Sequence, residues 1–297
     1  MRFVLAGASG FLGQALRARL TGDGHEVTQL VRRPPRAADQ AQWDPDRSQV
    51  DAEVLAGADA VVNLAGASIG RVPWTESYRQ TIRTSRLATT STLARALADL
   101  PDPPVFLSGS ATGYYGKDRG DLLLDEDSPA GDGFLAELCR DWEAATDPAE
   151  HAGVRVVHLR TSPVFDRSGG AFKVMELQFR LGAGGRLGSG RQYLPMISLN
   201  DWLSAVQFLA EQADARGPYN LTVPEPTTNA EFTKVLGAAL RRPTLLPVPA
   251  VALRTALGEF SAEMLGSVRL IPRRLLAAGF TFADPDVTAL VDSALHR

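Results

Sequence analysis

Short apolar runs alternate with longer amphipathic segments along the first two thirds of the chain. The pattern predicts strands at residues 4–6, 26–31, 42–44, 58–66, 104–110, 155–160 and 219–221, and helices that begin at Leu12 and that cover 78–100, 134–145 and 200–211. Strands that alternate with helices are typical of a parallel sheet whose connections cross over its faces. We therefore expect an α/β fold, a doubly wound parallel Rossmann sheet with a smaller, mostly helical C-terminal region.

The pattern becomes less regular beyond Pro163. Residues 181–191 are rich in glycine and favour a mobile wall or lid of a cleft over a plain linker. In the helical regions further on, Asn200 and Asn229 are the expected helix caps. The domains that we expect are a dinucleotide-binding domain at 1–221, with 166–198 contributing to the substrate cleft, and a small C-terminal domain at 222–297.

The most informative motif follows the first strand, where residues 4–13 read VLAGASGFLG. In this turn Gly7 permits the sharp bend off the strand, and Gly10 lets backbone N–H groups approach a pyrophosphate. Gly13 allows the next helix to pack on the sheet with its positive end toward the phosphates. Structural turns also use glycine, but a strand before the motif and an amphipathic helix after it favour dinucleotide binding. The expected cofactor contacts are Gly7, Ser9, Gly10, Phe11, Leu12 and Gly13.

The end of the second strand indicates which dinucleotide is bound. In a Rossmann unit an acidic residue at this place accepts hydrogen bonds from the ribose 2′-hydroxyl of NAD. This chain has Arg32 and Arg33 there, and no carboxylate. A guanidinium suits the 2′-phosphate of NADP, to which it can donate two hydrogen bonds. We predict NADP(H) as the cofactor; the alternative is that both arginines are solvated surface residues.

Composition argues against several other classes of protein. The chain has 297 residues, 44% of them hydrophobic, and its formal net charge of −3 disfavours nucleic acid or an anionic membrane as the main partner. The chain starts with a core strand and has no long apolar run, so we expect a cytoplasmic, unanchored protein. The single cysteine, Cys139, is expected to be a buried thiol, and the scattered histidines predict no metal site. The acidic residues at 121–127 read as a solvated loop.

Motifs at the ends of the fourth and fifth expected strands carry a family resemblance. Together with the glycine turn, these motifs resemble those of the extended short-chain dehydrogenase/reductases, which include nucleotide-sugar epimerases. The motifs are Asn63-Leu64-Ala65-Gly66, the run from Ser108 to Thr112, and Tyr114-Tyr115-Gly116. Further segments resemble one atypical branch, the "epimerase family" oxidoreductases: Trp74-Thr75, Ser85-Arg86, 134–139, Trp142-Glu143, 188–192 and 272–280. The resemblance covers nearly the whole chain.

The resemblance implies where the cofactor and the substrate lie. It places the adenine and the inner ribose beside Leu64, Ala65 and Gly66, and the nicotinamide near Ser108, Ser110 and Pro163. Arg191 and Tyr193 stand where the family places substrate contacts, and Arg191 suits an anionic group; the alternative is a surface loop. Many relatives pair through helices like those at 78–100 and 134–145, so a homodimer is expected by analogy.

The chain departs from the family at the catalytic couple. The family uses a Tyr-x-x-x-Lys pair at the start of the helix after the fifth strand, in which the lysine holds the nicotinamide ribose and the tyrosine moves a proton. Here that place reads Gly-Phe-Leu-Ala-Glu-Leu at 133–138, so Phe134 and Leu138 replace the couple. The resemblance assigns to Ser110 a hydrogen bond to the reacting oxygen. Tyr114 or Tyr115 is the candidate proton donor; packing against the pocket wall is the alternative for both.

Three functions remain open on these observations. The first is an NADP(H)-dependent oxidoreductase acting on a small carbonyl or alcohol, with a replacement acid or with the proton supplied by substrate or water. The second is a nucleotide-sugar epimerase or dehydratase, which the missing tyrosine disfavours because oxidation of an unactivated alcohol needs a base. The third is a non-catalytic NADP(H)-binding sensor or scaffold. We expect the first, with a small-molecule substrate.

Overall fold

A computed structural model describes residues 1–71, 73–244, 246–257 and 260–296. Its strands are β1 (Arg2–Ala6), β2 (Glu26–Val31), β3 (Gln40–Asp44), β4 (Gln49–Val50), β5 (Ala60–Asn63), β6 (Val105–Ala111), β7 (Leu123–Leu124), β8 (Val156–Thr161), β9 (Val164–Phe165), β10 (Tyr193–Leu194), β11 (Ile197–Ser198), β12 (Gly217–Leu221), β13 (Thr227–Thr228) and β14 (Arg269–Leu270). Its α-helices are α1 (Phe11–Gly22), α2 (Ala52–Leu55), α3 (Glu76–Ala98), α4 (Phe134–Ala144), α5 (Asp147–His151), α6 (Gly170–Arg180), α7 (Leu199–Glu211), α8 (Asn229–Ala239), α9 (Ala250–Leu257), α10 (Phe260–Leu265), α11 (Arg273–Ala277) and α12 (Val287–His296). Two 3-10 turns complete the list, η1 (Pro45–Arg47) and η2 (Thr112–Tyr115).

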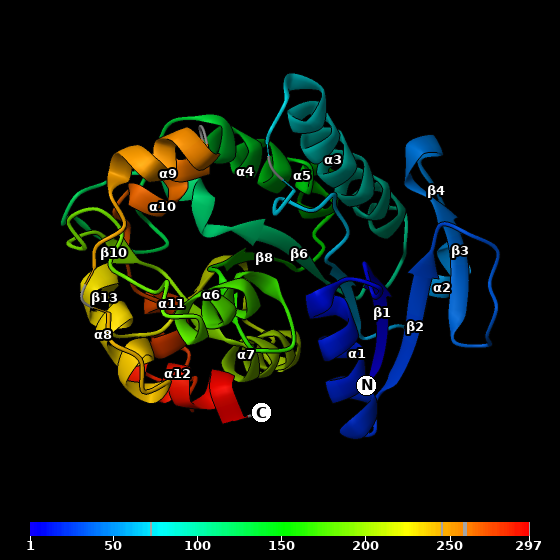
Figure 1. Cartoon of the computed structure of the whole chain (residues 1–297). Helices are drawn as coiled ribbons and strands as arrows, with labels where there is room; N and C mark the ends of the chain where they lie inside the picture. Colours follow the sequence, from blue (N-terminus) through cyan, green and yellow to red (C-terminus); the bar gives the residue numbers. More distant parts are fainter. Residues whose placement is uncertain (72, 245, 258–259, 297) are drawn as a thin grey trace.

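The centre of the molecule is an eight-stranded sheet in the order β12-β8-β6-β5-β1-β2-β3-β4. Every neighbouring pair in it is parallel except β3 and β4 at one edge (Figure 1). The chain winds outward from β1 to β3 on one side and from β5 to β12 on the other. The expected doubly wound α/β fold is therefore confirmed, and its switch point lies between β1 and β5, where such sheets bind ligands.

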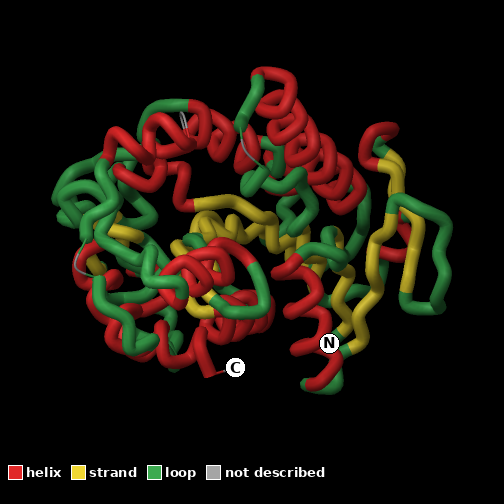
Figure 2. The backbone as a smooth tube through the Cα atoms, in the orientation of Figure 1, coloured by secondary structure: helices red, strands yellow, loops and turns green. Residues whose placement is uncertain are grey.

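Alternating side chains of β1 divide the core into two layers. Phe3 and Leu5 face the layer that contains α1 and α7, whereas Val4 and Ala6 face the layer that contains α3. Figure 2 shows helices on both faces of the sheet. Strands buried on both faces explain why the expected strands read as continuous apolar runs rather than as alternating ones.

The C-terminal region packs against the segment that follows β8. Phe165, Phe172 and Phe179 share one apolar cluster with residues of α8 and α12. Three small two-stranded sheets tie this half together, pairing β10 with β13, β9 with β11, and β7 with β14. These short strands and α6 were not expected, because runs of two residues and a glycine-flanked helix leave little periodicity. The expected domain limits stay a prediction.

Two expected helix caps are wrong by one or two residues. The side chain of Ser198, not of Asn200, accepts the hydrogen bond from the first turn of α7, and Thr228 does so for α8. Asn229 instead accepts a hydrogen bond of 2.7 Å from the N–H of Leu187 and so holds the glycine-rich loop. Serine and threonine compete with asparagine for the cap position, and the sequence offered both.

The expected solvated acidic loop is also a different feature. Asp125 and Asp127 form ion pairs with Arg273 and Arg274 at the start of α11. Glu126 is buried, and one of its carboxylate oxygens accepts hydrogen bonds from the N–H groups of Asn220 and Arg274. Burial raises the pKa of Glu126. The loop therefore fastens the C-terminal region to the sheet, through partners about 150 residues away that the sequence does not place.

Within the described residues no helix is long and apolar enough to cross a membrane. The same part of the chain brings together no group of three or more His, Cys, Asp and Glu side chains that could hold a metal ion.

Candidate active site

The glycine turn connects β1 to α1 at the switch point of the sheet. Gly7 has φ +84°, and a Cβ there would lie 2.6 Å from the carbonyl carbon of Leu64. A Cβ on Gly13 would lie 2.2 Å from the Gly7 oxygen, so both positions require glycine for packing. A Cβ on Gly10 would meet only the Gly7 oxygen at 3.4 Å, so this residue faces open space. The first turn of α1 has no side-chain cap, which leaves its N–H groups available to a phosphate.

Phe11 and the glycines before α6 close one side of this turn. A Cβ on Gly169 would lie 2.5 Å from the Phe11 ring, and Gly170, with φ +65°, follows it. The ring of Phe11 is therefore covered by chain that lies 160 residues away in sequence. Ser9 and Gly10 remain exposed beside it, and Leu12 is half-buried. These residues fit the pyrophosphate site that the sequence predicts.

Arg32 and Arg33 lie exposed where β2 ends. Arg33 donates to the side chain of Gln40 and to the carbonyl of Pro34 at 3.3 Å each. The Arg32 guanidinium has no hydrogen-bond or ion-pair partner among the residues that the structure describes. Of the two arginines, Arg32 is thus the one with all its donors available for a phosphate.

The end of β5 forms the next part of the cleft. Asn63 is buried; its amide donates to Thr90 at 3.0 Å, and its oxygen accepts from the N–H of Ala65 at 3.1 Å. This pair of bonds fixes the turn that carries Leu64, Ala65 and Gly66, which are partly or fully exposed. The expected cofactor contacts at these three positions are therefore accessible.

Ser108 and Ser110 both lie in β6. Ser108 is fully buried, in register with Asn63 and His158, and its role beside the cofactor stays a prediction. Ser110 donates its hydroxyl proton to Glu143 at 2.7 Å. A hydroxyl that donates to a carboxylate offers only lone pairs to a substrate. In this geometry Ser110 can accept a hydrogen bond but cannot donate one to a reacting oxygen.

Glu143 and Arg160 form a buried ion pair that the sequence analysis missed. Glu143 accepts from both Nε and Nη2 of Arg160 at 2.8 Å, and the Arg160 side chain is only 4% exposed. Burial alone would lower the pKa of Arg160, but the hydrogen bonds and charge of Glu143 outweigh it and raise that pKa. An arginine that ends an apolar strand, as in His158-Leu159-Arg160, is the signal that could have identified it.

The two candidate tyrosines have different environments around Arg160. Tyr115 is fully buried; its hydroxyl donates to Asn220 at 2.7 Å and accepts from Arg160 at 3.0 Å. Burial, which the nearby Arg160 only partly offsets, raises the pKa of Tyr115 to about 12. Tyr114 is half-buried, and the Arg160 guanidinium lies 3.5 Å from the centre of its ring. The hydroxyl of Tyr114 makes no hydrogen bond to any described residue.

The helix α4 turns a different face to β6 than the sequence suggests. Leu135 and Cys139 face the strand end: a Cβ on Gly113 would lie 3.1 Å from Leu135, and the Cys139 thiol donates to the carbonyl of Ala111 at 3.5 Å. Burial raises the pKa of the Cys139 thiol to about 12, as expected for an inert thiol. Neither Leu135 nor Cys139 is a tyrosine or a lysine. The family couple is therefore absent both at 134 and 138, where the sequence places it, and at 135 and 139, which face the strand end.

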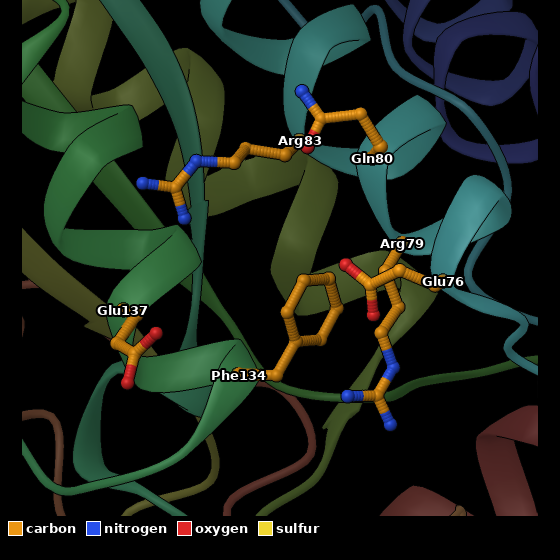
Figure 3. Close-up of a pocket in the computed structure, with 6 residues that line it drawn as sticks. All are labelled: Glu76, Arg79, Gln80, Arg83, Phe134 and Glu137. Atoms are coloured by element: carbon orange, nitrogen blue, oxygen red, sulfur yellow. The ribbon is translucent and has the colours of Figure 1, made fainter.

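Phe134 points away from β6, toward α3. The Arg79 guanidinium lies 5.3 Å from the centre of its ring, and Trp74 meets it edge-on at 5.8 Å. Figure 3 shows Phe134 between side chains of α3 and α4 in a cavity of about 430 Å³. The residues that line this cavity are Glu76, Arg79, Gln80, Arg83, Phe134 and Glu137.

The remaining predicted residues lie on the C-terminal side of the cleft. Pro163 is exposed directly after β8. Arg191 is exposed in the glycine-rich loop, and Tyr193 lies in β10 with the Arg269 guanidinium 5.1 Å from the centre of its ring. The substrate roles of Arg191 and Tyr193 stay predictions.

Comparison with known proteins identifies relatives over the whole chain. Epimerase family protein MT2273 of Mycobacterium tuberculosis is 46% identical over 279 residues, which are 94% of this chain and 92% of that protein. Human epimerase family protein SDR39U1 is 38% identical, over 97% of this chain and 98% of its own. A crystal structure of human SDR39U1 isoform 2 with NADPH matches all of both chains with a TM-score of 0.88 at 35% identity.

A second solved structure agrees in fold. It is a nucleoside-diphosphate sugar epimerase from Corynebacterium glutamicum, 34% identical with a TM-score of 0.81, matching 99% of this chain and 58% of that one. A domain of unknown function, DUF1731, matches residues 248–294. The NAD dependent epimerase/dehydratase family matches residues 3–221. The resemblance read from the glycine turn and the strand ends is confirmed: this chain is a member of the NAD dependent epimerase/dehydratase family, within the group of epimerase family proteins that includes SDR39U1.

Proposed function

We propose that this protein is an NADP(H)-dependent oxidoreductase that reduces an activated carbonyl, such as a conjugated ketone or aldehyde. The cofactor part of the proposal rests on the open Gly10 turn, the uncapped first turn of α1 and the free guanidinium of Arg32. The human relative solved with NADPH supports the same choice. When bound, the cofactor supplies the hydride.

In this proposal the chain holds the dinucleotide along the carboxyl ends of four strands, β1, β2, β5 and β8. The first turn of α1 and the N–H groups around Gly10 bind the pyrophosphate, and Arg32 binds the 2′-phosphate. Leu64 and Ala65 lie beside the middle of the dinucleotide, and Pro163 lies beside its nicotinamide end. Of these groups, only Arg32 distinguishes NADP(H) from NAD(H).

The single observation that carries the proposed reaction is the placement of Tyr114. Its ring is stacked on Arg160 at 3.5 Å, while its hydroxyl has no partner in the described part of the chain. Glu143 balances the positive charge of Arg160, so the ion pair adds little net charge beside Tyr114. Its main effect is to hold the Tyr114 ring in position. In this proposal Tyr114 donates a proton to an oxygen that gains negative charge.

The same contacts disfavour the reverse task of deprotonating an alcohol. The Tyr115 hydroxyl is buried, and the lysine that would stabilise a tyrosinate is missing. Epimerisation of a sugar requires such a base, so we place it second. Reduction of an activated carbonyl needs only a donor, which is what Tyr114 offers.

The test is oxidation of NADPH, followed by absorbance, over a panel of activated carbonyls. We expect turnover of at least one compound, and a loss of roughly 10²-fold or more in Tyr114→Phe, since general acids contribute about 10²–10⁴-fold. NADPH affinity should change less than about twofold. Tyr219→Phe, which removes a hydroxyl from β12, is the matched control and should retain turnover. Undiminished turnover in Tyr114→Phe would remove this residue as the donor.

If NADPH binds tightly and no carbonyl is reduced, the sensor or scaffold becomes the better assignment.

Two further expectations stand as proposals, a homodimer through α3 and α4 and a location in the cytoplasm. The first is checked by measuring the molar mass in solution.

A further inference from the structure

Arg86 on α3 is a half-buried cation beside the end of β5. Its Nη1 donates to the carbonyl oxygens of Ala67 at 3.0 Å and Ile82 at 3.2 Å. Its guanidinium lies 5.0 Å from the centre of the Trp142 ring. A Cβ on Gly66 would lie 3.2 Å from three of its atoms, so the guanidinium lies against the turn that follows β5.

This guanidinium has fewer partners than a buried charge normally has. No carboxylate pairs with it, and none of its hydrogen bonds involves Nε or Nη2, within the ranges that the structure describes. Burial lowers the pKa of Arg86, which reflects the same lack of a compensating charge. Buried cations are costly unless they are paired or fully hydrogen-bonded. Several N–H donors of Arg86 are thus available to an acceptor that the chain itself does not provide.

The position of Arg86 corresponds to one half of the dinucleotide. In a doubly wound sheet the adenosine half lies over the β1–β2 side of the switch point, and the other half over the side that here starts with β5. Arg86 lies between the ends of β5 and β6, because its guanidinium contacts Gly66 in the turn after β5 and the Trp142 ring, which packs on Gly109 of β6. This position favours a contact with the nicotinamide half.

The helix that normally supplies a lysine has none to offer here. The residues of α4 that face the end of β6 are Leu135 and Cys139. A cation from α3 thus reaches the region from which the α4 cation is absent.

We propose that Arg86 replaces the missing lysine by donating hydrogen bonds to the hydroxyl oxygens of the ribose on the nicotinamide side of the bound dinucleotide. This inference rests on the proposed function. It adds a residue that holds the nicotinamide ring in place, whereas Arg32 selects the adenosine phosphate. An alternative use of Arg86 is to brace the turn at Ala67, and the two uses predict different binding results.

The experiment compares two ligands by calorimetric titration, NADPH and 2′,5′-ADP, which lacks the nicotinamide ribose. In Arg86→Met we expect NADPH to bind about 10- to 100-fold more weakly, the loss typical of hydrogen bonds to a charged group. Binding of 2′,5′-ADP should change less than about twofold. Arg86→Lys should restore part of the NADPH affinity. Arg95→Met, an exposed arginine on the same helix, is the matched control and should bind both ligands normally.

Three results would overturn the inference. If Arg86→Met binds NADPH and 2′,5′-ADP equally more weakly, Arg86 braces the turn instead. If Arg86→Met binds NADPH as the unaltered protein does, Arg86 has no role in binding. If Arg86→Lys recovers no NADPH affinity, a charge-based contact is excluded. Circular dichroism establishes that each variant is folded; if Arg86→Met is not, Arg86→Gln takes its place. Failure of the unaltered protein to bind NADPH would instead overturn the proposed function.

Discussion

Glu143→Gln tests whether the buried ion pair organises the site. Three hydrogen bonds converge on Glu143, one from Ser110 at 2.7 Å and two from Arg160 at 2.8 Å. A glutamine keeps one acceptor oxygen but turns an amide N–H₂ toward the donors of Arg160. The variant therefore leaves the guanidinium of Arg160, whose side chain is 4% exposed, without a counter-charge.

The expected cost is about 3 kcal/mol, the lower end of the roughly 3–5 kcal/mol measured when one partner of a buried pair is removed. At about 2 °C per kcal/mol for a chain of this size, the melting temperature should fall by roughly 6 °C. The assay is urea unfolding followed by circular dichroism, with a thermal scan beside it. The control is Arg19→Met, which breaks an exposed pair with Asp23 and should cost less than about 0.5 kcal/mol.

A double variant separates the pair from its surroundings. Glu143→Met combined with Arg160→Met removes both charges, so its cost should be smaller than the sum of the two single costs by at least about 1 kcal/mol. Stability of Glu143→Gln within about 1 kcal/mol of the unaltered protein would refute the reasoning, because it would mean that Arg160 does not depend on Glu143.

Three more predictions concern the turn, the buried tyrosine and the thiol. Gly10→Ala should fold normally but bind NADPH at least about tenfold more weakly in titration, whereas Gly13→Ala should lower the unfolding free energy, because its methyl group would lie 2.2 Å from a backbone oxygen. Tyr115→Phe should cost about 1–3 kcal/mol in urea unfolding, since it leaves Asn220 without its donor; an unchanged midpoint would contradict the contact. Cys139 should resist a thiol reagent in native protein at pH 8. Burial raises the pKa of the Cys139 thiol from 9.0 to about 12. The contribution of the buried thiol to the unfolding free energy should therefore be complete below pH 9 and be lost as the pH rises toward 12. In Cys139→Ala the unfolding free energy should depend less on pH over this range.

The sequence was sufficient for the parts of this protein that local rules determine. The turn from Gly7 to Gly13 is recognisable because each glycine answers a backbone requirement, and the strands are recognisable because both faces of the sheet are buried. The helices α3, α4 and α7 begin or end within a few residues of their expected limits, since apolar periodicity is local.

The rest depends on contacts between distant segments, which no local pattern contains. Ser110 was expected to face a substrate, but its proton goes to Glu143, 33 residues later. Tyr114 and Tyr115 are adjacent and alike in sequence, but Tyr115 is buried in a cluster with Leu124, Val268 and Leu270, whereas Tyr114 is half-buried beside Arg160. In the sequence Arg86 is only part of the Ser85-Arg86 motif, because its packing against Gly66 is a property of the fold.

The proposed function requires selective binding of NADP(H). The decisive measurement is a fluorescence titration of the unaltered protein and of Arg32→Ala with NADPH and with NADH. We expect saturable NADPH binding, at least about tenfold tighter than NADH, and loss of that preference in Arg32→Ala with NADH affinity unchanged. Equal affinity for the two cofactors, or an equal loss of both in the variant, would contradict the assignment of the 2′-phosphate to the end of β2.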